Sequence, residues 1–414
     1  MLQKINASSM GRKAFVFFTG FLLMFFISRL SAAEVLLGLT SLYAVYARFK
    51  EGKWPAKSFE NSLVRRVLIA IAISLIGYIL SDLYYGSEFA DLAAGWGRWI
   101  FLGINFVGLS CLLGMRWSNL HLIVLGEAIG GVVALYTVSD EPGDWWKFGF
   151  AVPVTFGVLT LTDKRPRVLA GLALLILGTV HIFLAFRSLG TACFIGGALV
   201  FVPKIGKRFR KAAVVGAMVI VVPVLIYIFS AAGFNEDEAR SKGSNENRSD
   251  MLVVGWNAFV DHPFLGNGSR LVKTGVMERY FAERTLRSKD KRVLTEEDET
   301  EKSLHTQILS ALAEGGLLGG AFFFIYGLIL LRALQIAVFN EFSHRPIVLV
   351  FLILGCFDFW MSPFSTTARF EIALYCSTAV TLIVAVRQGD LGVAAPFLRL
   401  IRLIRGVRKE VAQA

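Results

Sequence analysis

The chain has 414 residues, a formal net charge of +12 and a mean hydropathy of +0.60, with 55% hydrophobic and 18% charged residues. This composition is too apolar for a water-soluble protein. Apolar stretches of about 20 residues, the length that a helix needs to cross a bilayer, recur along the chain. The sequence therefore predicts an all-α polytopic membrane protein that forms one integral membrane domain over residues 1–414.

Hydropathy predicts about twelve membrane-spanning helices, and because several are short or interrupted by glycine the range is ten to twelve. They cover residues 13–29, 32–48, 65–84, 96–115, 119–138, 147–162, 167–186, 189–204, 212–233, 307–335, 346–362 and 369–387. Ser31, Ala32 and Ala33 resemble a signal-peptide cleavage site. The long apolar run before them and the span directly after them favour a retained helix.

Lysine and arginine concentrate in alternate connections, whereas the intervening short connections carry acids such as Asp82 and Glu88. This positive-inside pattern predicts that both termini are cytoplasmic. We attribute the net positive charge to anionic lipids of the inner leaflet rather than to nucleic acid. Residues 390–414, with arginines at three-residue spacing, are predicted to form a basic amphipathic tail on that leaflet.

A long connection at residues 234–303 separates the ninth and tenth predicted spans, on the outer side by the charge rule. Its segments MLVVGWNAFV and MERYFAERTL can form short amphipathic helices, and DHPFLGNGSR between them is rich in turn residues. Long connections are uncommon unless they are functional or disordered. The acidic run TEEDETEK is interpreted as a solvated face.

Cysteines and potential metal ligands are dispersed. Cys111, Cys193, Cys356 and Cys376 fall in predicted spans, which indicates packed free thiols. Histidine and carboxylate side chains show no metal-ligand spacing, and Asp261-His262-Pro263 is most simply a helix stop. The sequence predicts neither a metal nor a cofactor.

Two arginines are candidates for binding an anionic group. Arg187 lies between two apolar helices with almost no loop around it, where it either anchors the interface or binds a phosphate through its rigid fork. Arg248 opens the first helix of the long connection. The alternative to anion binding by Arg248 is a surface ion pair with Asp250 or Glu246.

His305 stands where the charged connection gives way to an apolar helix. If Ser303 caps that helix, His305 falls in its first turn, where the helix dipole favours a neutral, proton-accepting imidazole. The alternative is a histidine that only satisfies a helix end. A polar face follows, formed by Thr306, Gln307, Ser310 and Glu314. The glycine pairs 315/319 and 316/320 are suited to close helix packing.

Three segments, FRSLGTA, NRSDMLVVGWNAFVDHPFLGNGS and SLHTQILSALAEGGLLGG, resemble in this order the shared region of the O-antigen ligase and polymerase superfamily. The match covers roughly residues 180–330, about a third of the chain. Thr306 departs from the family pattern, in which an asparagine commonly follows the histidine.

The resemblance implies a metal-independent, membrane-embedded glycosyltransferase of the GT-C-like type. Such an enzyme moves a glycan from undecaprenyl diphosphate to an acceptor hydroxyl at the periplasmic face of the bacterial inner membrane. By residue, Arg187 and Arg248 resemble the arginines that engage the donor diphosphate, and His305 resembles the proposed base. Possible supporting residues are Arg270, Arg369, Gln307 and Glu314.

Within this family the sequence favours a ligase that transfers a finished polysaccharide to lipid A–core. A polymerase that extends the chain on its lipid carrier is the first alternative, and a protein O-oligosaccharyltransferase is the second. A lipid-linked glycan transporter would spread polar residues through the midplane of several helices. Here they gather at one face, which favours an enzyme.

Cysteine accessibility tests the predicted topology. Single cysteines at Thr295 and at Ala414, in a protein without the four native cysteines, should react with impermeant reagents from opposite sides of the membrane. Labelling of both from the same side would show that the predicted topology is wrong.

Overall fold

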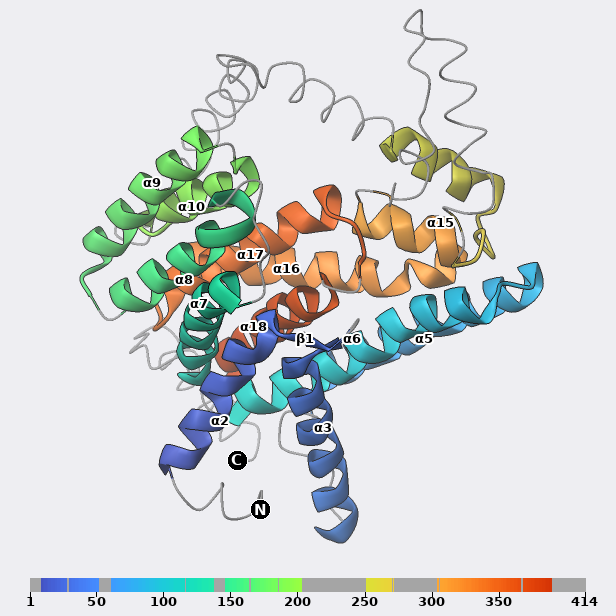
Figure 1. Ribbon diagram of the computed structural model, residues 1–414, viewed down its shortest axis with the longest axis horizontal. Coiled ribbons are helices and arrows are strands. Elements are labelled where there is room, and N and C mark those ends of the chain that lie inside the picture. The colour runs from blue at the N-terminus through green and yellow to red at the C-terminus, as the bar shows by residue number, and fades with distance from the viewer. Residues whose placement is uncertain are drawn as a thin grey trace, which may run out of the picture.

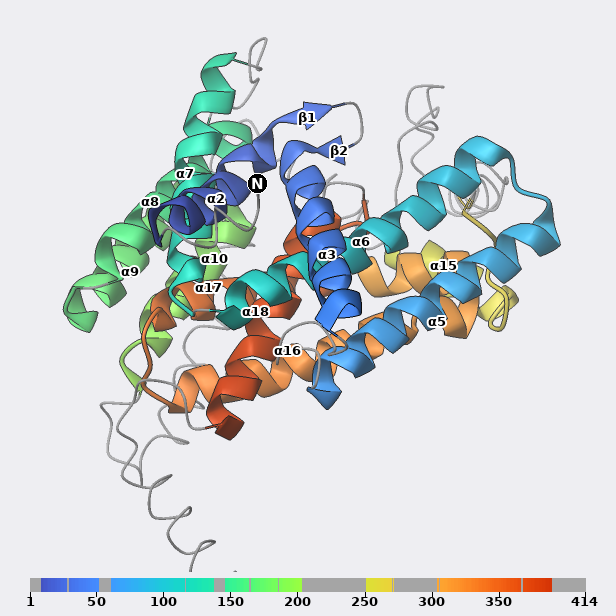
Figure 2. The same ribbon diagram turned by 90° about the horizontal axis from the view of Figure 1, so that it is seen from below.

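The computed structural model describes residues 9–27, 30–51, 61–115, 117–137, 146–163, 165–184, 186–202, 251–269, 271, 304, 306–365 and 368–388. Helices dominate these residues, and the one small sheet is a hairpin of β1 (Phe26–Ile27) and β2 (Leu30–Ser31). Figures 1 and 2 show the helices from two directions.

In chain order the principal helices are α2 (Ser9–Phe21), α3 (Ala32–Glu51), α5 (Ser62–Tyr85), α6 (Phe89–Met115), α7 (Asn119–Thr137), α8 (Ala151–Thr162), α9 (Arg167–Phe183), α10 (Arg187–Leu199), α15 (Gln307–Gly319), α16 (Ala321–Phe339), α17 (Arg345–Met361) and α18 (Ala368–Gln388). A 3-10 turn, Leu22–Met24, follows α2, and a π-helical turn, Trp146–Phe150, precedes α8. The segment MLVVGWNAFV forms the helix Met251–Asp261.

Five of the described helices are long and apolar enough to cross a membrane: α5, α6, α7, α16 and α18. Shorter apolar helices occupy other predicted spans, among them α8 and α9. The prediction of an all-α membrane protein is thus confirmed. The number of spans stays a prediction, and the span expected at residues 212–233 lies outside the described residues.

Helix α3 begins with a reciprocal cap that joins it to distant helices. The Ser31 hydroxyl accepts a hydrogen bond from the backbone of Ala33, while the Glu34 carboxylate accepts one from the backbone of Ser31. Glu34 also binds the Arg369 guanidinium of α18 through two contacts of 2.6 Å and accepts a bond from Asn105 of α6. Residues that resemble a cleavage site in the sequence therefore form a helix cap here.

Arg345 satisfies the carbonyl ends of two helices. Its side chain is buried and donates to the carbonyls of Ala337 and Val338 at the end of α16 and of Leu199 and Val200 at the end of α10. These carbonyls have no partner within their own helices, and the cation is favourable at the negative end of each helix dipole. Arg345 thus holds three helices together.

Helix α10 packs closely against two neighbours. Gly178 of α9 faces the carbonyl of Gly190, and Gly190 faces that of Gly178, so that side chains are excluded at this crossing. On its other side, Gly196 packs against Val350 of α17. Because Arg345 at the start of α17 reaches the end of α10, these two helices run antiparallel.

The helix predicted over residues 307–335 is broken. Gly316 has a φ of 64° and a ψ of −160°, which interrupts α15, and Gly319 packs back against the carbonyl of Ala311. Helix α16 starts only at Ala321. The prediction of one continuous helix was wrong because Gly316 supplies a backbone conformation that side-chain-bearing residues avoid.

Substituting Gly316 by alanine should destabilise the protein. Its backbone conformation, with φ 64° and ψ −160°, is essentially restricted to glycine and costs about 1–3 kcal/mol for a residue with a Cβ atom, and the added methyl group would collide with the carbonyl of Phe264. The apparent melting temperature of the purified protein in detergent measures the loss. The control is Gly157→Ala in α8, where an added Cβ meets nothing within 4 Å. Equal melting temperatures for both variants would contradict the assigned break.

Candidate functional site

The sequence-predicted site residues divide into two groups. His305, Arg248 and Arg270 lie outside the described residues. The described ones are Arg187, Gln307, Glu314 and Arg369. Around His305, both chain neighbours are described and both are buried: Leu304 at 4% and Thr306 at 2% exposure.

Helix α15 begins at Gln307, two residues after His305, whereas the sequence predicted His305 within the first turn. Thr306, with extended backbone, is the N-cap of this helix. The Thr306 hydroxyl donates to the carbonyl of Trp360 in α17 instead of capping α15. Ser310 donates to the carbonyls of Leu304 and Thr306, which fixes the approach to the helix.

The helix Met251–Asp261 packs directly on this approach. Its inner face joins a small apolar core cluster made of Met251, Val254, Ala258, Leu271, Leu304 and Ala313. Gly255 brings the helix backbone close to the Leu304 side chain. The outer face remains apolar, with Val253, Trp256 and Val260 more than half exposed.

The turn after that helix completes the hydrogen bonds of the broken α15. The Leu317 amide donates to the carbonyl of Pro263, 2.8 Å away, rather than to its own helix. The carbonyl of Ala313 accepts bonds from the backbone and side-chain amides of Asn267, and that of Glu314 accepts one from Gly268. Two segments of the predicted site are therefore joined through their backbones.

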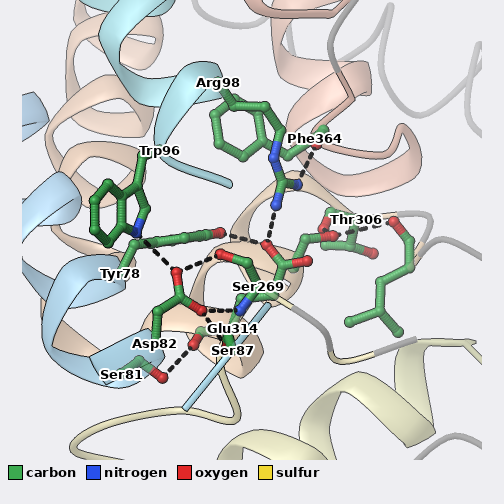
Figure 3. A network of polar contacts seen from close by, with 12 residues as sticks. Tyr78, Ser81, Asp82, Ser87, Trp96, Arg98, Ser269, Thr306, Glu314 and Phe364 are labelled. Carbon is green, nitrogen blue, oxygen red and sulfur yellow. Dashed lines mark hydrogen bonds and ion pairs between the residues drawn. The ribbon is translucent and has the colours of Figure 1, made fainter. Parts of the chain in front are cut away.

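Asp82 at the end of α5 holds the far side of the same turn (Figure 3). Its carboxylate accepts bonds from the backbone and hydroxyl of Ser269, at 2.7 and 2.8 Å, and from the indole of Trp96 in α6. Ser87 donates to it as well. Asp82 is buried, and its carboxylate binds Ser269 of the turn to α5 and, through Trp96, to α6.

Glu314, two residues before the break at Gly316, forms a buried ion pair with Arg98. Its Oε2 lies 2.6 Å from Nη2 of Arg98 and 2.7 Å from the hydroxyl of Tyr78 (Figure 3). Arg98 also donates to the carbonyl of Phe364, and Ser81 donates to the carbonyl of Glu314. The carboxylate is compensated, as a buried charge in an apolar setting must be.

An aromatic core supports this ion pair. Trp99, next to Arg98 in α6, is fully buried and touches Phe322 and Phe323 edge-on. Its ring centroid lies 4.8 Å from that of Phe364, whose ring also lies beneath the Arg98 guanidinium. The guanidinium is thus held between a carboxylate and aromatic faces, which fixes its orientation.

Gln307 is the one predicted site residue with an unsatisfied side-chain atom. It is 1% exposed, and its Oε1 has no hydrogen-bond partner among the described residues. Buried polar atoms in native proteins normally have a partner. The amide oxygen is therefore free to accept a hydrogen bond from a group beside the start of α15.

Arg187 is the first residue of α10 and is half-buried, with contacts of its own. Since α10 and α17 are antiparallel, the start of α10 lies toward the end of α17. The same end of α17 carries Trp360, which accepts the bond from Thr306. Arg187 and Thr306 thus lie toward the same end of α17.

Arg369 is placed differently. It is buried, paired with Glu34 and stacked on Phe101 at 4.7 Å. The pair joins α3 to α18 and gives Arg369 a structural role in the helix packing.

Sequence reasoning did not assign Tyr78, Asp82 or Arg98 to the site. The only signals were an acid at the end of one apolar span and an arginine inside the next. Neither shows its partner, because Glu314 lies more than 200 positions away in the chain.

The fold and this network define a polytopic membrane protein with buried ionic contacts at one end of its helices. Residues 152–324 match the family model described as O-antigen ligase, a stretch that runs from α8 into α16 and includes the helix Met251–Asp261 and α15. No curated protein matches the chain. This match confirms the resemblance found in the sequence.

Removing Arg98 alone should be more harmful than removing the whole ion pair. Arg98→Met leaves the Glu314 carboxylate without its cation and should cost about 3–5 kcal/mol, whereas Arg98→Met combined with Glu314→Gln should recover much of the loss. Apparent melting temperatures of the purified variants measure this. Arg332→Met, at an exposed arginine bonded to Gln335, is the control. A double variant no better than the single one would argue against the pairing.

Proposed function

We propose that the protein is a glycosyltransferase that moves a glycan from undecaprenyl diphosphate to an acceptor hydroxyl at the periplasmic face of the inner membrane. The acceptor we propose is lipid A–core, which makes the reaction O-antigen ligation. The match to the O-antigen ligase family model supports glycosyl transfer. Extension of the glycan on its own carrier, as a polymerase does, uses the same donor and chemistry and is the alternative.

The observation that carries the proposal is the joining of two segments at the break in α15. The turn Pro263–Ser269 follows the helix that Arg248 precedes, and α15 follows His305. Backbone bonds to Ala313, Glu314 and Leu317 hold these segments in one register. The described segments that follow Arg248 and His305 in the sequence are therefore fixed against each other, which supports a shared site.

The proposed chemistry needs a base and anion-binding groups. His305 takes the proton from the acceptor hydroxyl, whose oxygen attacks the anomeric carbon of the donor sugar. The bond from that carbon to the diphosphate breaks, and undecaprenyl diphosphate leaves with the bonding electrons. Arg187 and Arg248 stabilise the departing charge, so that no metal is required for this step. Gln307, through its free Oε1, orients the acceptor hydroxyl or the imidazole.

The exposed apolar face of the helix Met251–Asp261 suits a lipid-linked donor. Val253, Trp256 and Val260 present a surface that a membrane interface would cover. A carrier lipid lying in the outer leaflet would bring its diphosphate to the level of this helix.

His305→Gln tests the base. Glutamine can hydrogen-bond the acceptor hydroxyl but cannot accept its proton, so transfer should fall by about 10²–10⁴-fold while donor binding is retained. Purified protein given lipid-linked donor and lipid A–core acceptor provides the measurement, with melting temperature checked alongside. Transfer close to the parent rate would remove His305 from the role of base. Elongation of carrier-linked glycan without transfer to lipid A–core would identify a polymerase.

Arg187→Lys in the same assay separates phosphate binding from anchoring. Lysine keeps the charge but loses the bidentate fork, so phosphate binding predicts weaker donor binding and slower transfer. Near-parent activity would assign Arg187 to the interface.

A further inference from the structure

We propose that His121, Asp163 and His344 bind a divalent transition-metal ion that ties α7, the α8–α9 connection and α17 together. Their ligand atoms all lie within 4.8 Å of one another. One oxygen of Asp163, Oδ2, lies 3.3 Å from Nδ1 of His121 and 2.5 Å from Nδ1 of His344. Ligand atoms around a tetrahedral zinc ion are about 3.4 Å apart, so the contact between His344 and Asp163 would lengthen by about 1 Å on binding.

The cluster contains polar atoms that hydrogen bonding does not satisfy. Asp163 Oδ1 and His121 Nδ1 are buried and have no hydrogen-bond partner among the described residues. The Asp163 side chain is 1% exposed. A buried carboxylate with a spare oxygen beside two ring nitrogens offers three ligand atoms to a cation.

The backbone at His344 is held in an unusual conformation. Its φ of 61° makes it the only non-glycine residue with positive φ among those the structure describes. A residue with a Cβ atom pays about 1–2 kcal/mol for this geometry. Next to it, the carbonyl of Ser343 accepts a bond from the indole of Trp117, which draws the α16–α17 connection toward the start of α7. Strained residues of this kind cluster at functional sites.

Two imidazole nitrogens and a carboxylate oxygen favour zinc and neighbouring transition metals over magnesium or calcium, which prefer oxygen ligands. Two nearby cations among the described residues are engaged elsewhere, since Arg167 pairs with Glu341 and the Arg345 guanidinium binds helix carbonyls. Three protein ligands leave one position for water.

The metal site lies away from the proposed transfer site. His344 precedes α17 and Trp360 lies near its end, so the two are separated by about 24 Å at 1.5 Å per residue. Positive charges beside His121, Asp163 and His344 place this cluster at the predicted cytoplasmic end. The ion therefore stabilises the helix arrangement and takes no part in glycosyl transfer.

Metal analysis of the full chain tests the proposal. Protein purified through a tag without histidine, from cells supplied with zinc, should carry about one zinc ion per chain by mass spectrometry. His344→Asn is the sharpest variant, because asparagine tolerates the left-handed backbone. It and Asp163→Asn should bind zinc at least about tenfold more weakly. His262→Ala removes an exposed histidine outside the cluster and should keep the metal.

Reconstitution provides a second measurement that does not depend on the variants. Adding zinc chloride to chelator-treated parent protein should raise the apparent melting temperature, with little change in His344→Asn. A parent protein that carries no transition metal and is not stabilised by zinc would reduce the cluster to a hydrogen-bonded triad and overturn the proposal. Variants that retain the parent's zinc content would overturn it equally.

Discussion

A helix that breaks inside an apolar environment must find new partners for its backbone, because no water is present to supply them. The break at Gly316 exposes the carbonyls of Ala313 and Glu314 and the amide of Leu317, and the turn that contains Pro263, Asn267 and Gly268 satisfies all three groups. Much of the site depends on this exchange. Through it, α15 fixes the turn, and the turn presents Ser269 to Asp82.

Buried charge is the second constraint. Arg98, Arg345 and Arg369 are each taken up by internal partners: a carboxylate, helix carbonyls and a second carboxylate. Such charges are costly in a bilayer unless paired, and each pairing here joins elements that are distant in sequence. These arginines, which a topology prediction uses only as charges at the membrane surface, therefore also determine which helices pack together.

The sequence was sufficient for what depends on composition and short segments. Hydropathy located the apolar helices, and the ordered segments from FRSLGTA to SLHTQ indicated the family. It was insufficient where partners are far apart, as with Tyr78 and Glu314 or with His121 and His344. The sequence also did not predict the break at Gly316, because a glycine in such a pair can either allow close helix packing or adopt a positive φ. The role of Thr306 as the N-cap of α15 was not predicted, since its hydroxyl bonds to α17 and makes no side-chain cap.

The interlocked backbones at the break also bear on how such a protein can diversify. The turn at residues 262–269 could be exchanged between relatives only together with a compatible stretch around 313–317. In a chimera joined between these two stretches, the amides of one parent would face carbonyls of the other parent that are not positioned to accept their hydrogen bonds. The helix Met251–Asp261, the turn after it and α15 through the kink at Gly316 are therefore expected to be exchanged as one unit.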